Sequence, residues 1–258
     1  MKPHSFQLLG CRVDALGLNA AVKAILEAID DVHAGHGEPA FVVTIGTEMI
    51  VRAQHDEIFR QTLARARFSL CDTIGVLLAS RLRGGPLRER VVGVTLAERL
   101  CELLAKRGDS VYFLGAAGDT AEAAAIGLKI RYPGLQIAGS RDGFFRFEES
   151  SEVAQTIRAT GATLLLVALG SPKQEEWIDR HLRETGCAVA IGVGGAFDVF
   201  SGRVPRAPAA WQMLGLEWLY RLIKEPQRWR RQLALPHFVF LAAREVCSAA
   251  LPRKEPRR

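Results

Sequence analysis

The sequence predicts an α/β fold, a Rossmann-like and mostly parallel sheet flanked by helices, with a basic helical C-terminal appendage. Continuous apolar runs of strand length alternate with helical segments, as is typical of parallel sheets buried on both faces. These runs stop near Gly202, where a helical region rich in arginine begins. We therefore expect an α/β body over residues 1–202 and an appendage over residues 203–258.

Five apolar runs are expected to be strands of the sheet. They are Ala40–Thr44, Val111–Gly115, Leu135–Gly139, Thr163–Gly170 and Ala188–Gly194. A shorter apolar run ends at Asp72. Their alternation with helical segments predicts a doubly wound sheet, in which ligands bind at the carboxyl ends of the strands. The polar residues at those ends are therefore the candidate site residues.

The charge of the chain is concentrated in the appendage. The sequence has 34 Lys and Arg against 28 Asp and Glu. Residues 201–258 carry a net charge of +8, and the rest of the chain carries −2. Such a basic tail is typical of proteins that bind phosphates, acidic lipid head groups or nucleic acid.

Targeting and membrane-spanning signals are not expected in this chain. Its first residues show no basic stretch followed by an apolar one, so we expect no signal peptide. The apolar run Leu233–Ala243 contains a Pro and a His and is too short to span a bilayer. The five cysteines form no C-x-x-C pair and are typical of a reducing compartment. Any membrane contact is therefore expected to be peripheral.

Asp72 and Thr44 are the candidates for chemistry at the strand ends. Asp72 is a candidate general base, although its position alone favours an N-cap of the helix expected over Thr73–Arg83. Thr44 is a candidate for orienting a substrate hydroxyl, or an ordinary β-branched strand residue. These alternatives stay open on the residues alone.

Four further residues are candidates for binding a ligand. Gln174 either contacts a ligand or belongs to a capping box that starts at Ser171. Asp198 either contacts a sugar hydroxyl or ties down its own turn. Gly115 and Gly194 lie in glycine-rich turns that allow close approach to a diphosphate, but such turns also occur without one.

Motifs for metals and nucleotide triphosphates are absent from the sequence. It contains no G-x-x-x-x-G-K-[ST] and no D-x-D, and its six histidines are scattered. We therefore expect no metal site and no cofactor. If a diphosphate binds here, arginines and helix N-termini have to balance its charge.

Arginines of the appendage can supply that charge. Arg221, Arg228 and Arg231 share one helical face if the helix continues past Pro226. The alternative is a solvated basic face. Tryptophan and other aromatic side chains alternate with these charges, which suits either a membrane interface or core packing.

Four long motifs occur together in this chain and carry a resemblance. They are ERVVG (Glu89–Gly93), GSPKQEEW (Gly170–Trp177), GVGGAFDVFSGRVPRAP (Gly192–Pro208) and LGLEWLYRLIKEPQRWRRQ (Leu214–Gln232). In this order they resemble the WecG/TagA/CpsF glycosyltransferases, family 26 of the sequence-based classification. The resemblance extends from about Ala40 to about Leu233.

The resemblance implies a bacterial, inverting, metal-independent transferase. Such an enzyme moves an N-acetylmannosamine-type or glucose-type sugar from a UDP-sugar to a polyprenyl-diphosphate-linked sugar. It works in cell-wall or exopolysaccharide biosynthesis, in the cytoplasm at the inner face of the plasma membrane. The acceptor lipid would be undecaprenyl diphosphate, and the appendage would contact the anionic membrane surface. No nucleic-acid partner is implied, and the oligomeric state stays open.

The resemblance also assigns roles to residues. It implies that Asp72 is the base and Thr44 its neighbour at the first strand end. Substrate-binding roles fall on Arg90, Gln174, Arg221, Arg228 and Arg231. Two positions depart from the family pattern, because Gly46 stands where an Asn is common and Thr73 where a Gly is common.

Two rival classes remain on the sequence alone. A nicotinamide-dependent oxidoreductase would need a complete glycine fingerprint and an acidic residue at the end of the next strand. A non-enzymatic nucleic-acid-binding protein would use the basic appendage alone. Binding of UDP would separate the transferase from the second class.

Overall fold

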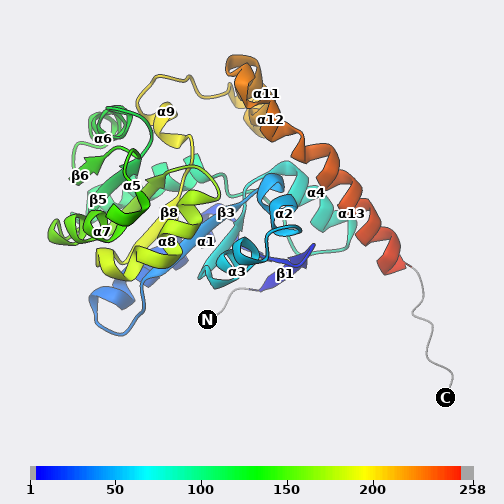
Figure 1. Ribbon diagram of the computed structural model, residues 1–258, viewed down its shortest axis with the longest axis horizontal. Helices are drawn as coiled ribbons and strands as arrows, with labels where there is room; N and C mark the ends of the chain where they lie inside the picture. Colours follow the sequence, from blue (N-terminus) through cyan, green and yellow to red (C-terminus); the bar gives the residue numbers. More distant parts are fainter. Residues whose placement is uncertain (1–3, 251–258) are drawn as a thin grey trace.

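The structure is a computed structural model, and it shows one sheet covered by helices on both faces with a helical appendage at one end (Figure 1). It describes residues 4–250, apart from the side chains of Arg228, Arg230, Arg231 and residues 248–250. The α/β prediction is therefore confirmed.

The sheet has eight strands in the order β1-β2-β4-β3-β8-β7-β5-β6. They are β1 (Ser5–Leu8), β2 (Cys11–Asp14), β3 (Ala40–Ile45), β4 (Phe68–Cys71), β5 (Ser110–Gly115), β6 (Gln136–Arg141), β7 (Leu164–Ala168) and β8 (Val189–Gly192). All paired neighbours are parallel except β1 and β2. The five predicted strands correspond to β3 and β5–β8.

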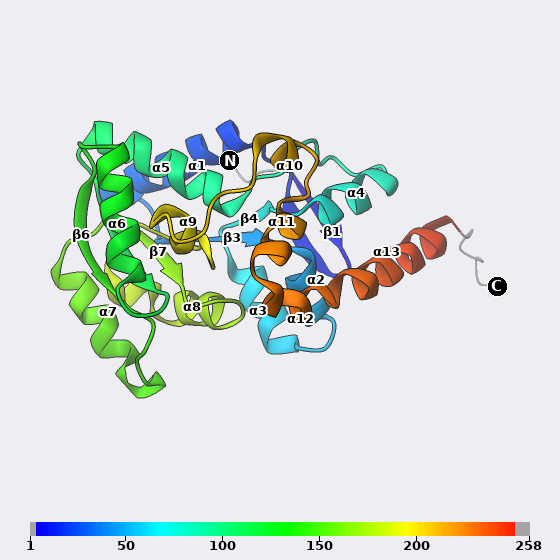
Figure 2. The same cartoon turned by 90° about the horizontal axis from the view of Figure 1, so that it is seen from above.

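Helices lie on both faces of the sheet (Figure 2). One face is covered by α1 (Leu18–His33), α5 (Gly93–Arg107), α6 (Thr120–Arg131) and α9 (Ala196–Phe200). The other is covered by α2 (Thr47–Ala53), α3 (Glu57–Arg65), α4 (Ile74–Leu82), α7 (Ser150–Ala159), α8 (Lys173–Thr185) and α13 (Ala234–Ala250). A short η1 (Phe147–Glu149) precedes α7.

The two cores are made by alternate residues of the same strands. On β5, Val111 and Phe113 belong to the first core, whereas Tyr112 and Leu114 belong to the second. Successive side chains of a strand point to opposite faces, so a strand covered on both faces is apolar throughout. This is why the continuous apolar runs predicted the strands correctly.

The N-terminal hairpin was not predicted from the sequence. Its first strand, β1, is an antiparallel edge strand with mostly exposed or half-buried residues. In β2, Asp14 is buried, accepts a hydrogen bond from the Ser69 backbone at 2.8 Å and pairs with Arg12. A polar edge hairpin of four-residue strands lacks the apolar run that identifies a strand.

The appendage is a chain of short helices followed by one long helix. It comprises α10 (Ala209–Met213), α11 (Glu217–Lys224), η2 (Pro226–Arg228), α12 (Trp229–Gln232) and α13. The helix does not continue past Pro226, which was the condition for a face shared by the three arginines, because α11 ends at Lys224 and the chain bends before Pro226.

The last helix of the appendage packs against the body. It contacts α2 and α4, and Phe238 and Ala242 are buried in the second core. Figure 1 shows α13 running along these two helices. Within residues 4–250, none of the helices is both long enough and apolar enough to cross a bilayer.

Candidate active site

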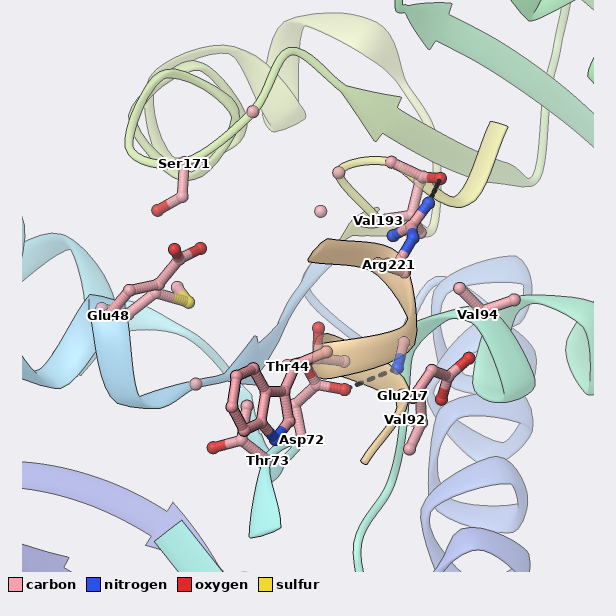
Figure 3. Close-up of a pocket in the computed structure, with 18 of the residues that line it drawn as sticks. Thr44, Glu48, Asp72, Thr73, Val92, Val94, Ser171, Val193, Glu217 and Arg221 are labelled. Atoms are coloured by element: carbon pink, nitrogen blue, oxygen red, sulfur yellow. Dashed lines mark hydrogen bonds between the residues drawn. The ribbon is translucent and has the colours of Figure 1, made fainter. Parts of the chain in front are cut away.

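A cavity of about 570 Å³ lies at the carboxyl ends of the parallel strands. Residues that follow β3, β4, β5, β7 and β8 line it together with residues of the appendage, among them Glu217 and Arg221 (Figure 3). Parallel strands bring their carboxyl ends to one edge of the sheet. The polar strand ends that are far apart in sequence therefore share this cavity.

Asp72 lies at the bottom of the cavity, directly after β4. Its Oδ1 accepts a hydrogen bond from the backbone N–H of Gly93 at 3.0 Å. Gly93 is the first residue of α5, so Asp72 binds the N-terminus of α5. The alternative that it caps α4 is wrong, because Thr73 holds that position and makes no side-chain cap.

The surroundings of Asp72 favour its protonated form. Burial raises the pKa of this carboxyl to about 6; Glu217 and Glu48 act in the same direction, while the Gly93 hydrogen bond and Arg90 lower it. Desolvation therefore outweighs the favourable helix N-terminus. A carboxylate with a pKa near neutrality is a suitable general base.

Thr44 lies beside Asp72, near the end of β3. Both line the cavity, and Figure 3 shows their side chains close to each other. A methyl group on Gly93 would come within 3.0 Å of the Thr44 hydroxyl oxygen. The start of α5 thus contacts both Thr44 and Asp72, and the absence of a side chain at Gly93 permits it.

Gln174 is held by hydrogen bonds at both ends of its amide. Its Oε1 accepts from the Gly194 backbone N–H at 3.0 Å, and its Nε2 donates to Glu175 Oε1 at 2.7 Å. The capping-box alternative is therefore wrong, since α8 begins at Lys173 with Pro172 as its N-cap and without a side-chain cap. One N–H of Gln174 remains for a ligand.

Glu175, the next residue in the chain, has a buried carboxyl group that accepts the hydrogen bond from Gln174. Only 2 % of its surface is exposed. Burial raises the pKa of Glu175 to about 7, while the hydrogen bond from Gln174 lowers it. Gly192 leaves the space that both side chains occupy, because a methyl group there would lie 2.7 Å from Gln174 Nε2 and 3.1 Å from Glu175 Oε1.

Two arginine contacts join the appendage to the rim of the cavity. Arg90, just before α5, donates to the backbone oxygen of Gln212 at 2.6 Å. Arg221 of α11 donates to the backbone oxygen of Gly195 at 2.7 Å. Both guanidinium groups also line the cavity. The same two residues therefore join the appendage to the body and place positive charge at the cavity.

The structure brings most of the expected site residues together. Asp198, in the first turn of α9, and Gly194 also line the cavity. Gly115 does not, although Ala116 does. The φ of Gly115 is +118°, and a methyl group there would collide with the Ala168 backbone at 2.5 Å. The side chains of Arg228 and Arg231 lie outside the described residues.

Several lining residues were not found from the sequence. They are Glu48, Ser171, Glu217, Trp218 and Gln232. Glu217 and Trp218 belong to the motif LGLEWLYR, in which the spacing of the arginines was the only signal of a ligand. Glu48 and Ser171 are polar residues that follow strand ends, so their positions in the sequence could have identified them as candidates. Gln232 has no such position, because tertiary packing of the appendage alone brings it to the cavity.

Charge in the described lining is mixed. It includes the carboxylates of Glu48, Asp72, Asp198 and Glu217 and the guanidinium groups of Arg90 and Arg221. Within the described part of the chain, no three His, Cys, Asp or Glu side chains are grouped as metal ligands.

The fold and cavity define a class: an α/β protein with a ligand cleft at the carboxyl edge of a parallel sheet, covered by its own C-terminal helices. The chain belongs to the glycosyl transferase WecG/TagA/CpsF family, whose model matches residues 6–251. This confirms the resemblance found in the sequence motifs and makes the chain a glycosyltransferase. The oxidoreductase and nucleic-acid-binding alternatives are not favoured.

Two curated relatives come from Bacillus. The chain is 34% identical over 235 residues to an N-acetylglucosaminyldiphosphoundecaprenol N-acetyl-beta-D-mannosaminyltransferase of Bacillus spizizenii, covering 91% of each chain. It is 32% identical over 228 residues to the protein of the same name from Bacillus subtilis strain 168, covering 88% of each. These relatives are thus similar along nearly their whole length.

Proposed function

We propose that this protein transfers an N-acetylmannosamine-type sugar from a UDP-sugar to a polyprenyl-diphosphate-linked N-acetylglucosamine. The names of the two Bacillus relatives support this acceptor and this sugar. The position of Asp72 in the cavity carries the mechanistic part of the proposal. The product would enter bacterial cell-surface polysaccharide biosynthesis.

The proposed reaction is a single displacement with inversion at the anomeric carbon. Asp72 accepts the proton of the acceptor hydroxyl while the hydroxyl oxygen attacks that carbon. The bond from the anomeric carbon to the UDP oxygen breaks, and UDP leaves with the bonding electrons. Among the described residues, Asp72 Oδ2 has no hydrogen-bond partner, so it is free to accept this proton while Gly93 holds Oδ1. Thr44 would orient the acceptor hydroxyl.

Protein cations are proposed to stabilise the leaving diphosphate. Arg221 and Arg90 both line the cavity, and each also hydrogen-bonds a backbone oxygen where the appendage meets the body. Arg228 and Arg231 are proposed to add to this charge. An arginine fork can bind phosphate oxygens in a bidentate manner and needs no divalent ion. Gln174, Gly194 and Asp198 are proposed to bind the nucleotide or the donor sugar.

The experiment that tests this function replaces the proposed base. Asp72→Asn should lower transfer by roughly 100-fold or more, because a general base contributes at least this much. Binding of UDP, measured by calorimetry, should stay close to that of the wild type. Wild-type activity should fall as the pH drops through about 6, because Asp72 must be deprotonated to accept a proton. EDTA should leave the rate unchanged.

A panel of UDP-sugars completes this test. UDP-N-acetylmannosamine should be used with higher catalytic efficiency than its uronate or UDP-glucose. Wild-type turnover by Asp72→Asn would remove Asp72 from the mechanism. Loss of activity in EDTA with recovery in Mg²⁺ or Mn²⁺ would contradict leaving-group stabilisation by arginine alone.

A further inference from the structure

Glu175 is a buried carboxyl group that the proposed mechanism does not use. Its side chain lies outside the lining of the cavity, and only 2 % of the residue is exposed. Burial of an ionisable group is unfavourable unless the group makes good polar contacts. Glu175 makes such a contact with Gln174, which does line the cavity. It is therefore one side chain removed from a ligand.

Two hydrogen bonds fix the direction in which the Gln174 amide faces. Its Oε1 accepts from the Gly194 backbone N–H at 3.0 Å, and its Nε2 donates to Glu175 Oε1 at 2.7 Å. A reversed amide would set its NH2 group against the N–H of Gly194 and its oxygen against the carboxyl oxygen, so both bonds would be lost. Because the amide is held at both ends, the second N–H of Nε2 keeps one direction.

The Glu175 carboxyl group is suited to be an acceptor for this amide. Burial raises its pKa to about 7 and Glu48 acts in the same direction, whereas the side chains of Gln174 and Ser171 lower it. A donor lowers the pKa of a carboxyl group because it binds the charged form more strongly. In the protonated form the carbonyl oxygen still accepts. The contact with Gln174 is therefore available in both protonation states.

The turn that Gln174 holds is also held by an arginine of the cavity. Gly194 donates its N–H to Gln174, and the backbone oxygen of the next residue, Gly195, accepts from Arg221 at 2.7 Å. Arg221 is the cation proposed above for the leaving diphosphate. The Gln174 amide and the Arg221 guanidinium thus bind successive residues of one turn. Both side chains line the cavity, so their N–H groups lie along the same part of its wall.

We propose that Glu175 is a positioning residue for the donor substrate: it holds the Gln174 amide with one N–H group available to the UDP-sugar. The inference rests on the proposed function, because it requires that Gln174 binds the UDP-sugar. It extends that function to a residue that does not touch the substrate. An apolar residue at position 175 could fill the same space, but it would leave the amide held at the Gly194 end alone.

Glu175→Leu tests this role, because leucine has a similar volume and offers no acceptor. Replacing a buried ionisable group with an apolar one of similar size is often tolerated, so the variant is expected to fold. The KM for UDP-N-acetylmannosamine should rise roughly three- to tenfold, which corresponds to about one hydrogen bond, while kcat stays within about twofold. Glu175→Gln should have a KM close to that of the wild type, because its amide oxygen still accepts from Gln174.

Glu176→Leu is the matched control. Glu176 lies in the same first turn of α8 but is partly exposed and outside the cavity lining, so this change removes the same charge from the same helix N-terminus. Its KM should equal that of the wild type. Thermal unfolding shows that each variant is folded at the assay temperature. Glu175→Met, with an unbranched side chain and a thioether that is only a weak acceptor, replaces Glu175→Leu if that variant does not fold.

A double-mutant cycle separates action through Gln174 from a general structural effect. In the Gln174→Ala background, Glu175→Leu should cause no further rise in KM, because the group that it positions is gone. An unchanged KM in Glu175→Leu, rises that add fully in the double variant, or an equal rise in Glu175→Gln would overturn the inference. An unchanged KM in Gln174→Ala would instead remove Gln174 from the donor site, and the inference would fail with that part of the proposed function.

Discussion

At the scale of single residues, Gly192 matters for the site because its lack of a side chain leaves room for the buried Gln174. Gly192→Ala would place a methyl group 2.7 Å from Gln174 Nε2, and the buried Gln174 has little room to move. We expect a loss of stability of about 1–3 kcal/mol from overpacking and weaker UDP-sugar binding as Gln174 leaves Gly194. Thermal unfolding and calorimetry measure the two effects.

The comparison variant is Gln174→Ala. If the added methyl acts through Gln174, the binding losses of the two variants should not add in the double variant. Fully additive losses would show that Gly192 affects the cavity by another route.

Residue roles were only partly readable from sequence. Asp72 and Thr44 were found because they follow apolar runs. Thr95 and Glu98 have the T-x-x-E spacing of a capping box, but α5 starts at Gly93 and both side chains contact Arg206 instead. A local pattern cannot show that a distant arginine competes for the same side chains. For the same reason, the sequence could not pair Gln174 with Gly194.

At the scale of elements, the break at Pro226 changes which arginines act together. Arg221 lies on α11, whereas Arg228 and Arg231 lie on η2 and α12. The spacing gives these arginines a shared face only on one continuous helix, and the break at Pro226 removes that condition. The positions of strands were easier to predict. A strand that is buried on both faces of the sheet is apolar at nearly every residue, so it is visible as a continuous apolar run.

Arg221 is expected to matter more than its charged neighbours on the appendage. Arg221→Ala should lower kcat/KM by roughly ten- to hundredfold, because a charge-assisted contact contributes about 1.5–3 kcal/mol. Arg228→Ala and Arg231→Ala are expected to act in the same direction. Lys224→Ala and Arg244→Ala should have little effect, since neither lines the cavity.

A soluble acceptor removes membrane docking from this comparison. Arg221→Lys should recover only part of the activity, because an ammonium group cannot reproduce the guanidinium fork. Equal losses in all five alanine variants would mean that the appendage supplies a general positive field and no specific contact.

At the scale of the whole molecule, half of the large apolar side chains that are exposed in the described residues lie on the short appendage. They include Met213, Leu214, Ile223, Trp229, Leu233, Val239 and Phe240, each more than half exposed. The same part of the chain carries the net charge of +8. Apolar side chains among basic residues are typical of a surface that lies on an anionic membrane. We therefore propose that residues 203–258 dock on the bilayer while completing the cavity.

Vesicle binding tests that placement. Leu233→Ser with Phe240→Ser should weaken binding to anionic vesicles by about tenfold or more, as expected for two apolar side chains withdrawn from the interface. Turnover of a soluble acceptor should persist. Phe147→Ser is the control, since Phe147 is 64% exposed and lies in η1, outside the appendage. Equal binding by both variants would place the membrane surface elsewhere.

The contacts of the appendage differ in kind along its length. Near the cavity it is joined by the hydrogen bonds of Arg90 and Arg221 to backbone oxygens. Farther along, Phe238 is buried in the core and α13 packs on α2 and α4. The polar contacts near the cavity can be replaced by contacts with water, whereas the apolar area around α13 is buried. The free energy of local opening is therefore lower near the cavity than at α13. We therefore expect a bulky lipid-linked substrate to enter where the appendage opens locally near the cavity, while α13 stays packed on the second core.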